Sequence, residues 1–236
     1  MQVQQAIFTS LRDGRVRGYQ LAARSPGVDD RTGQTLTKWG PSHAALCGAQ
    51  ADAESYNFHP IDDELFALSR TMYGGPEYSE RGGLQMVTRY ALLNRRQLEG
   101  FDNDAVALIR LARTEGGFQF ENRFETRLPE IKLSDASRSA FWLSTLAEGD
   151  LAIVEGVVER LGHGKRLAVT NCRDPLALLQ HVLHRIPIPQ RLDVSFTTGL
   201  KPTAHRPFHL HFLPDDSADL RRSTAALGLT CLAATG

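Results

Sequence analysis

Cysteine is scarce in this 236-residue sequence, and no apolar run is long enough to cross a membrane. The three cysteines, Cys47, Cys172 and Cys231, are odd in number and far apart, and no Cys-x-x-Cys pair occurs. They therefore indicate neither a disulfide framework nor a zinc ribbon. No apolar stretch approaches the roughly 20 residues of a membrane span, and the chain starts with the polar residues MQVQQ. We expect a cytoplasmic protein that does not associate with membranes.

An excess of charge of one sign is also lacking. Lys and Arg together number 27, and so do Asp and Glu, so the formal net charge is zero. This balance argues against a general binder of nucleic acids, which usually carries a basic surface. The hydrophobic content of 42% and the charged content of 23% are ordinary for a globular protein. The chain is long enough to bury a sizeable core.

Motifs for catalysis are missing as well. The sequence contains neither the Gly-x-x-x-x-Gly-Lys-Ser/Thr phosphate loop nor a Gly-x-Ser-x-Gly nucleophile turn. The candidate nucleophiles Ser25, Ser42, Ser79 and Cys47 have no recognisable base partner. The sequence therefore predicts no catalytic residue and no cofactor.

Three histidines close to the C-terminus, His205, His209 and His211, suggest a metal site, because residues two apart share one face of a strand. The positions that alternate with them are apolar: Phe208, Leu210 and Phe212. Because the apolar side chains claim the core-seeking face, we expect the histidines on the more solvated face and no bound metal.

Residues 64–93 have the most informative sequence pattern in the chain, that of a long β-hairpin. Two β-patterned runs, 64–73 and 84–93, flank the loop 74–83, which has a Gly pair at each end. Ten residues is long for a hairpin loop, where about two to five are usual, and long loops are often functional. The pattern predicts two adjacent antiparallel strands that present a polar and aromatic tip.

Other patterns predict the rest of the first half. Alternating apolar residues indicate a hairpin of strands 3–11 and 16–24 and a further strand over 55–61. The segment 29–38 is either a short helix or irregular, and Ser42 is a plausible cap for a short helix that reaches Cys47. Asp102 or Asn103 can start a helix that ends at Gly116-Gly117, and residues 119–126 alternate weakly.

The second half reads as a β-β-α-β-β-α pattern after a helix from Ser134 to Glu148. Asp174 as cap and Pro175 at the first helical position predict a helix that ends at Arg185. The expected strands and the last helix are residues 151–158, 166–170, 192–196, 208–212 and 215–227.

These elements give an α+β fold with antiparallel hairpins, packed helices and two closely associated halves. The first half, residues 1–115, is rich in strands, and the second, residues 116–236, mixes helices and strands. The pattern of strands and helices is interrupted at residues 115–130, but both halves can still share one core.

The candidate binding residues lie in the loop and in nearby turn-rich segments. They are Trp39, His43, His59, Arg70, Glu77, Tyr78 and Arg81. For the two histidines, capping and turn roles compete with a binding role. The charged residues of the hairpin, Arg70, Glu77, Glu80 and Arg81, either bind an anionic ligand or a partner, or form ion pairs that order the loop. An acid/base role for Glu77 and Glu80 is a third alternative.

A series of short motifs carries a family resemblance. The motifs are QAIFTS at 5–10, GYQLA at 18–22, SPG at 25–27, WGPSH at 39–43, LSRT at 68–71 and GPEYSxRGG at 75–83. In this order they resemble the N-terminal domain of the bacterial GTPase-associated protein family over about residues 4–115. The stretch IPxxLxVSFTTGL at 188–200 is similar to the segment that follows that domain. The resemblance implies a non-enzymatic adaptor or regulator beside a GTPase in a predicted signalling or conflict system.

Two hypotheses for function result. The first is an adaptor that binds a protein partner, such as a component of a GTPase system, through the loop 74–83 with Trp39–His43 beside it. The second is a small hydrolase or transferase whose pocket lies between the segments 39–43, 57–60 and 70–83.

Overall fold

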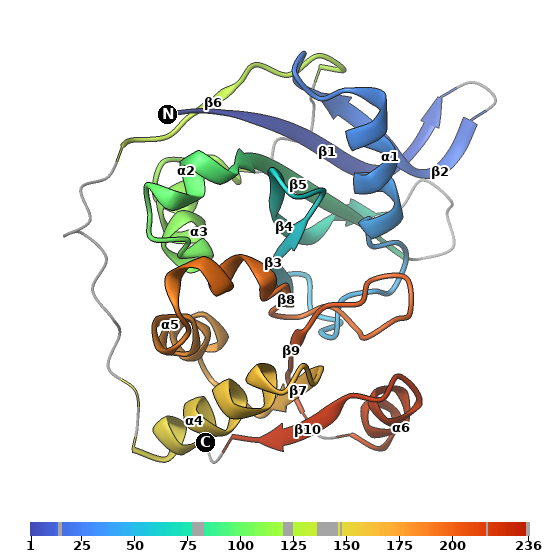
Figure 1. The fold of residues 1–236 in the computed structure, drawn as a ribbon. Helices are drawn as coiled ribbons and strands as arrows, with labels where there is room; N and C mark the ends of the chain where they lie inside the picture. The colour runs from blue at the N-terminus through green and yellow to red at the C-terminus, as the bar shows by residue number, and fades with distance from the viewer. Residues whose placement is uncertain are drawn as a thin grey trace.

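One mixed β-sheet runs through both halves of the chain in the computed structural model (Figure 1). The structure describes residues 1–13, 16–76, 83–119, 125–135, 146, 148–215 and 217–234. The strands are β1 Gln2–Asp13, β2 Val16–Arg24, β3 Glu54–Pro60, β4 Leu65–Pro76, β5 Leu84–Asn94, β6 Ile131–Lys132, β7 Leu167–Thr170, β8 Phe196–Thr197, β9 Leu210–Leu213 and β10 Thr230–Ala233. The helices are α1 Asp30–Trp39, α2 Arg95–Glu99, α3 Ala105–Thr114, α4 Glu148–Gly162, α5 Pro175–Arg185, the 3₁₀ helix η2 Ile188–Asp193 and α6 Ala218–Ala226. The α+β class is confirmed.

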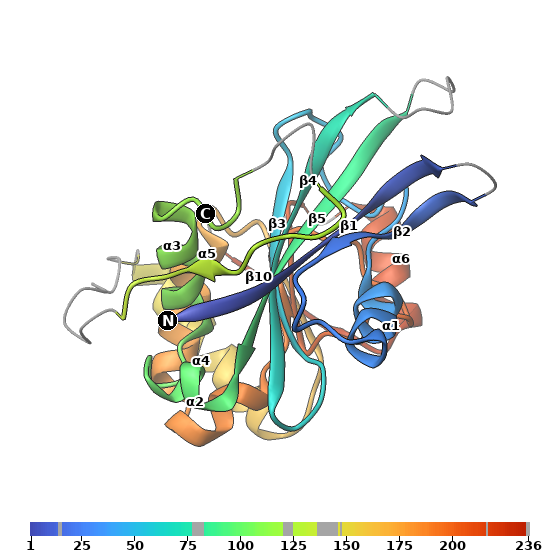
Figure 2. The same ribbon diagram turned by 90° about the horizontal axis from the view of Figure 1, so that it is seen from above.

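Both hairpins predicted in the first half are present. Strand β1 pairs antiparallel with β2, and β4 pairs antiparallel with β5 from Leu65↔Asn94 to Pro76↔Leu84. Strand β4 is longer than expected, because Gly74-Gly75-Pro76 continues it past an irregularity in the register. Figure 2 shows both hairpins extending beyond the helices at the same end of the sheet.

The second half adds parallel strands to this antiparallel sheet. The order is β10-β7-β9-β8-β3-β4-β5-β1-β2, and the pairs β10–β7, β7–β9 and β8–β9 are parallel. The two halves meet where Asn57 and Phe58 of β3 pair with Thr197 and Phe196 of β8. A single sheet therefore joins them.

Helices cover both faces of the sheet, as Figure 2 shows, with α2, α3, α4 and α5 on one side and α1 and α6 on the other. We call the two sides the α5 face and the α1 face. The main core lies on the α5 face and includes Phe58 and Leu68 from the first half and Phe196 and Leu179 from the second. Smaller apolar clusters on the α1 face pack beneath α1 and the segments 40–48 and 199–208.

Several predictions for the second half are wrong. Residues 151–158 belong to helix α4, where the buried Val154 and Val157 are spaced as one helical face requires. The pattern is therefore α-β-α-β-β-α-β; a short apolar run does not distinguish helix from strand by periodicity alone. Residues 188–193 form η2, because Pro187 and Pro189 start a tight turn rather than a strand.

Two predicted helix starts in the first half are also wrong. Residues 42–47 are not helical: His43 and Ala44 form a turn, with Ala44 in the left-handed region at a φ of 58°, and Leu46 bridges to Leu200. Helix α3 is capped by Asp104, whose carboxylate accepts hydrogen bonds from the Val106 and Ala107 amides at 2.9 and 3.0 Å. Asp102 and Asn103 are instead left-handed, with φ values of 53° and 56°.

The remaining predictions have mixed outcomes. The Asp174-capped helix α5 is confirmed, and of the two alternatives for 29–38 the structure shows the helix, α1. The last helix begins after Ser217 rather than after Asp215. The predicted helix from Ser134 and the weak strand at 119–126 fall mostly outside the described residues. Among the helices that the structure describes, none has the length and apolar character needed to span a membrane.

Candidate functional site

Two of the predicted site residues, Trp39 and His59, lie in direct contact on the α1 face. Trp39 is the last residue of α1, a helix that Asp29 caps by accepting the Thr32 amide at 2.7 Å. His59 is in β3 and is 1% exposed. The two rings stack with centroids 4.1 Å apart and an interplanar angle of 4°. Helix α1 is therefore fixed across the sheet by an aromatic contact.

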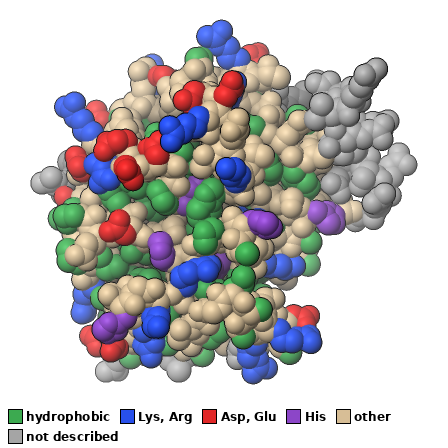
Figure 3. Space-filling model, turned by 45° about the vertical axis from the view of Figure 1, so that its right-hand side comes forward, with side chains coloured by type: hydrophobic (Ala, Val, Ile, Leu, Met, Phe, Trp, Pro, Cys, Tyr) green, Lys and Arg blue, Asp and Glu red, His purple; other side chains and the backbone are tan. Residues whose placement is uncertain are grey.

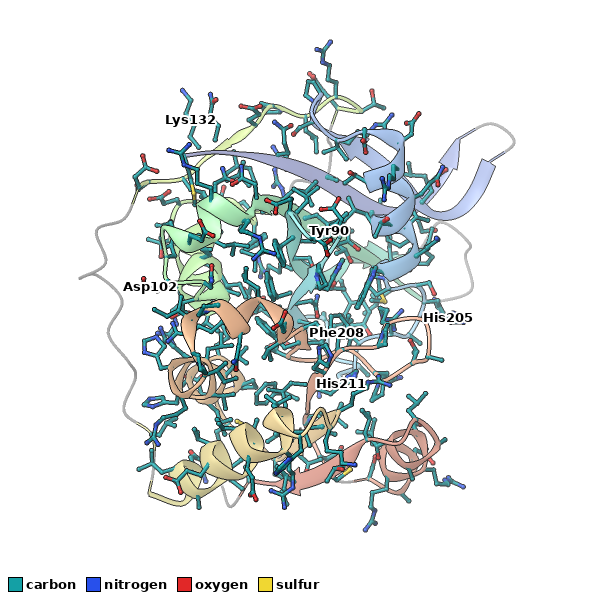
Figure 4. All side chains as sticks on the ribbon, viewed as in Figure 1. Tyr90, Asp102, Lys132, His205, Phe208 and His211 are labelled. Atoms are coloured by element: carbon teal, nitrogen blue, oxygen red, sulfur yellow. The ribbon has the colours of Figure 1, made fainter. Side chains whose placement is uncertain are left out.

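Further aromatic rings from both halves surround this pair. The ring of Phe208 lies edge-on to Trp39 at 5.0 Å, to His59 at 6.3 Å and to His211 at 5.7 Å. Tyr90 lies edge-on to His59 at 6.5 Å, and its hydroxyl donates to the Leu36 carbonyl. Figure 4 shows Tyr90, Phe208 and His211 close to the middle of the molecule and His205 farther out on its connection.

Strand register explains why these side chains meet. His211 pairs with Thr197, and Thr197 pairs with Asn57, which lies two residues before His59 in β3. Residues in register point to the same side of a sheet, so His211 and His59 share the α1 face.

The expectation that His211 would be solvated is wrong. It is 0% exposed, because β9 lies between β7 and β8 in the interior of the sheet and its residues Leu210–Leu213 are all buried. His205 and His209 are exposed. Within the described residues no three His, Cys, Asp or Glu side chains are close enough to hold a metal ion.

Burial keeps His59 neutral at physiological pH. Desolvation lowers the pKa of His59 to about 4, although the Pro60 carbonyl, 3.1 Å from Nδ1, raises it in part. Nδ1 therefore carries the proton, and Nε2 has no hydrogen-bond partner.

His211 lies in a positively charged environment. Burial and the charge of Arg166 lower the pKa of His211 to about 3, with a smaller lowering from Arg206 and an opposing contribution from the Leu200 backbone. The buried Arg206 is 6% exposed, and burial lowers its pKa too. The site thus combines aromatic surface with two guanidinium groups, which donate hydrogen bonds, and with neutral imidazole rings, each of which has one donor and one acceptor nitrogen.

Arg70 lies on the opposite face of the sheet from His59. It pairs with Tyr56 in the β3–β4 ladder, and the α5 face carries both side chains. The Arg70 guanidinium forms an ion pair with Glu54 at 2.6 Å and donates to the Phe118 carbonyl at 3.1 Å. His43 is exposed in the turn after α1. The structure therefore brings Trp39 and His59 together and keeps Arg70 apart from them.

The other predicted site residues, Glu77, Tyr78 and Arg81, lie outside the described residues. The described hairpin ends at Pro76 and resumes at Gly83. Only the chain connection shows that these residues link the end of β4 to the start of β5.

Sequence reasoning missed a second polar site, at the junction of the halves on the α5 face. The Asp104 carboxylate accepts hydrogen bonds from His184 Nε2 at 3.0 Å and from the Gln180 amide at 3.3 Å. Burial opposes its ionisation, but the hydrogen bonds from His184, Ala107 and Gln180 outweigh burial and lower the pKa of Asp104. A cavity of about 220 Å³ adjoins Asp104 and His184. The sequence pattern does not reveal this site, because it does not show that Asp102 and Asn103 form a left-handed turn directly before Asp104.

One family model matches the first part of the chain. The model of GTPase-associated protein 1, N-terminal domain type 2, matches residues 2–133, which is more than half of the chain. No curated protein and no solved structure matches the chain. The matched range contains Trp39, His59 and Tyr90, whereas Arg166, Arg206, Phe208 and His211 lie after it.

Proposed function

The chain belongs to the GTPase-associated protein 1 family through its N-terminal domain of type 2, and we propose that it is a non-enzymatic adaptor that binds a protein component of a GTPase system. The binding surface in this proposal is the end of the β4–β5 hairpin, residues 74–83, with Trp39–His43 on the α1 face as its neighbour. In this proposal the hairpin binds to the surface of a folded protein.

The projection of the hairpin is the observation that supports this proposal. Strands β4 and β5 pair as far as Pro76↔Leu84, and the β1–β2 hairpin lies in the same sheet and extends to the same end (Figure 2). Segments at such an end are accessible to a large partner, and loops on a rigid scaffold commonly carry binding residues.

The composition of the loop favours protein recognition. Tyr78 supplies an amphipathic ring and Arg81 a planar cation, and both residue types are enriched at protein interfaces. Glu77 and Glu80 add acidic groups.

The enzyme hypothesis requires one pocket shared by the segments 39–43, 57–60 and 70–83. Arg70 lies on the α5 face, whereas His59 lies buried under Trp39 on the α1 face. This separation favours the adaptor over the hydrolase or transferase.

The experiment is capture of partners from the native host with the full chain and with the variant Glu77→Ala/Tyr78→Ala/Arg81→Ala. We expect the wild type to retain a protein with a GTP-binding domain and the variant to lose it. The control is a double variant of α2, Arg96→Ala/Glu99→Ala, which removes one exposed charge of each sign, as the loop variant does.

Urea unfolding of the variants is part of this experiment. Exposed substitutions usually change the unfolding free energy by no more than about 0.5 kcal/mol each. A loop variant that stays folded and retains every partner of the wild type contradicts the proposal, as does a loop variant that unfolds.

A further inference from the structure

We propose that Arg166, Arg206 and His211 form a binding site for a phosphate group on the α1 face. The proposal goes beyond the adaptor function, because it concerns a site in the second half and not the end of the hairpin. A failure of either proposal leaves the other intact.

Unpartnered buried polar atoms are the first observation. Arg166 Nη2, Arg206 Nε and both ring nitrogens of His211 are buried and have no hydrogen-bond partner of good geometry. The large majority of buried polar side-chain atoms in proteins are hydrogen-bonded, and leaving one unsatisfied costs about 1–3 kcal/mol. The two guanidinium N–H groups, together with the single N–H of the neutral His211 ring, indicate an acceptor that binds there.

Uncompensated positive charge is the second observation. Within the described residues, neither Arg166 nor Arg206 forms an ion pair with a carboxylate; Arg166 Nε donates to the neutral carbonyl of Phe208 at 3.1 Å. Buried charges are normally paired, because desolvation of a lone ion is costly. The missing counter-charge is therefore that of an anion.

The groups converge from neighbouring elements. Arg166 directly precedes β7, and the pairing Leu167↔Leu210, Ala168↔His211 puts it on the same face as His211. Arg206 lies on the connection from β8 to β9, where it bridges to Thr203, whose buried hydroxyl also has no partner. Phe208 contacts all three residues: its carbonyl accepts from Arg166 Nε at 3.1 Å, its amide donates to the Arg206 carbonyl at 2.9 Å, and its ring lies 5.7 Å from the His211 ring.

The number and charge of the donors favour phosphate over carboxylate. Two guanidinium groups match the two negative charges of a phosphate, and guanidinium binds its oxygens through paired N–H donors. The Thr203 hydroxyl and the His211 ring supply further donors for the remaining oxygens.

The site adjoins the surface. Arg166 is half-buried and His209, two residues before His211, is exposed. Figure 3 shows Lys, Arg and His side chains together across the middle of the face on this side of the molecule, with most acidic side chains nearer its edges. A phosphate can approach along this positive region.

The test is titration of the full chain with inorganic phosphate, in which binding is measured by calorimetry and by the change in melting temperature. We expect saturable binding of phosphate and at least a tenfold loss of affinity in Arg166→Met and in Arg206→Met. Arg96→Met, which removes an exposed guanidinium from α2, is the matched control and should bind like the wild type. Parallel titrations with acetate and with chloride at equal ionic strength test whether binding is specific for phosphate.

A second measurement does not depend on the folding of any variant. The ¹⁵N resonances of the His211 ring in the wild-type protein should shift during the phosphate titration with the same dissociation constant. Equal effects of phosphate and chloride, preference for acetate, unchanged binding in folded Arg206→Met, or no shift of the His211 ring up to millimolar phosphate each overturn the proposal.

Discussion

The hydroxyl of Thr197 donates a hydrogen bond of 2.6 Å to the side-chain carbonyl of Asn57, and this contact joins the two halves of the chain. Thr197 is in β8, outside the family-matched range, and Asn57 is in β3, within it. The Asn57 amide in turn donates to Ser69 at 3.1 Å in β4. A buried polar network therefore crosses the boundary that the sequence suggests.

We expect Asn57→Leu to lower the unfolding free energy by about 2 kcal/mol or more, because it leaves several buried hydroxyls without a partner. Thr197→Val, which removes one hydroxyl at constant shape, should cost about 1 kcal/mol. The double variant in urea unfolding tests the link: a coupling energy below about 0.5 kcal/mol shows that the contact does not join the halves energetically.

Stability should fall in acid because of His59. Its pKa is lowered from 6.5 to about 4 in the folded state, so the unfolded chain binds a proton at a higher pH than the folded chain. Above pH 6.5, His59 is neutral in both states and does not lower the unfolding free energy. As the pH falls from 6.5 to 4, only the unfolded chain binds the proton, and the unfolding free energy drops by about 3 kcal/mol, at 1.36 kcal/mol per pKa unit.

His59→Phe keeps an aromatic ring against Trp39 and removes the titrating group. Urea unfolding of both proteins at pH 7.5 and pH 4.5 measures the difference. We expect a flatter pH dependence for the variant, and parallel curves would show that His59 is not the responsible group.

Gly75 should not tolerate a β-branched residue. Its φ is +114°, a conformation that L residues rarely adopt, although a Cβ there would meet no atom within 4 Å. Gly75→Val should therefore cost about 1–3 kcal/mol through backbone strain alone. Gly162 has the same open surroundings with an ordinary φ, so Gly162→Val is the control. An equal loss of stability in both variants would disprove the backbone explanation.

Asp104→Ala should destabilise the junction between α3 and α5. The change removes the cap of α3, worth about 0.5–2 kcal/mol, and the partner of His184 and Gln180. Asp29→Ala removes a cap from α1 at an exposed site and should cost less. Thermal unfolding of both variants measures this; a larger loss for Asp29→Ala would mean that the buried contacts of Asp104 contribute nothing.

Local chemistry made part of the fold predictable. Asp174 and Pro175 start α5 where the sequence indicates, because a side-chain cap and a fixed φ act within one turn. The β pattern in 64–73 and 84–93 predicted the central hairpin, because strand pairing through one connection depends on neighbouring segments.

The site was only partly predictable. Trp39 and His59 stand out in the sequence, but their contact depends on how α1 lies across the sheet. The burial of His211 follows from the position of β9 between two other strands, whereas alternation assumes that one face is solvated.

The sequence by itself determined the class of the fold, the family and the elements whose signals are local: the two hairpins and α5. Tertiary structure alone decided that both halves share one sheet, that 151–158 is a helix and that His211 is buried. The physical reason is that hydrogen bonds within a turn or a hairpin depend on adjacent residues. Pairing of β3 with β8 and burial of charge depend on residues more than a hundred positions apart, such as Asn57 and Thr197.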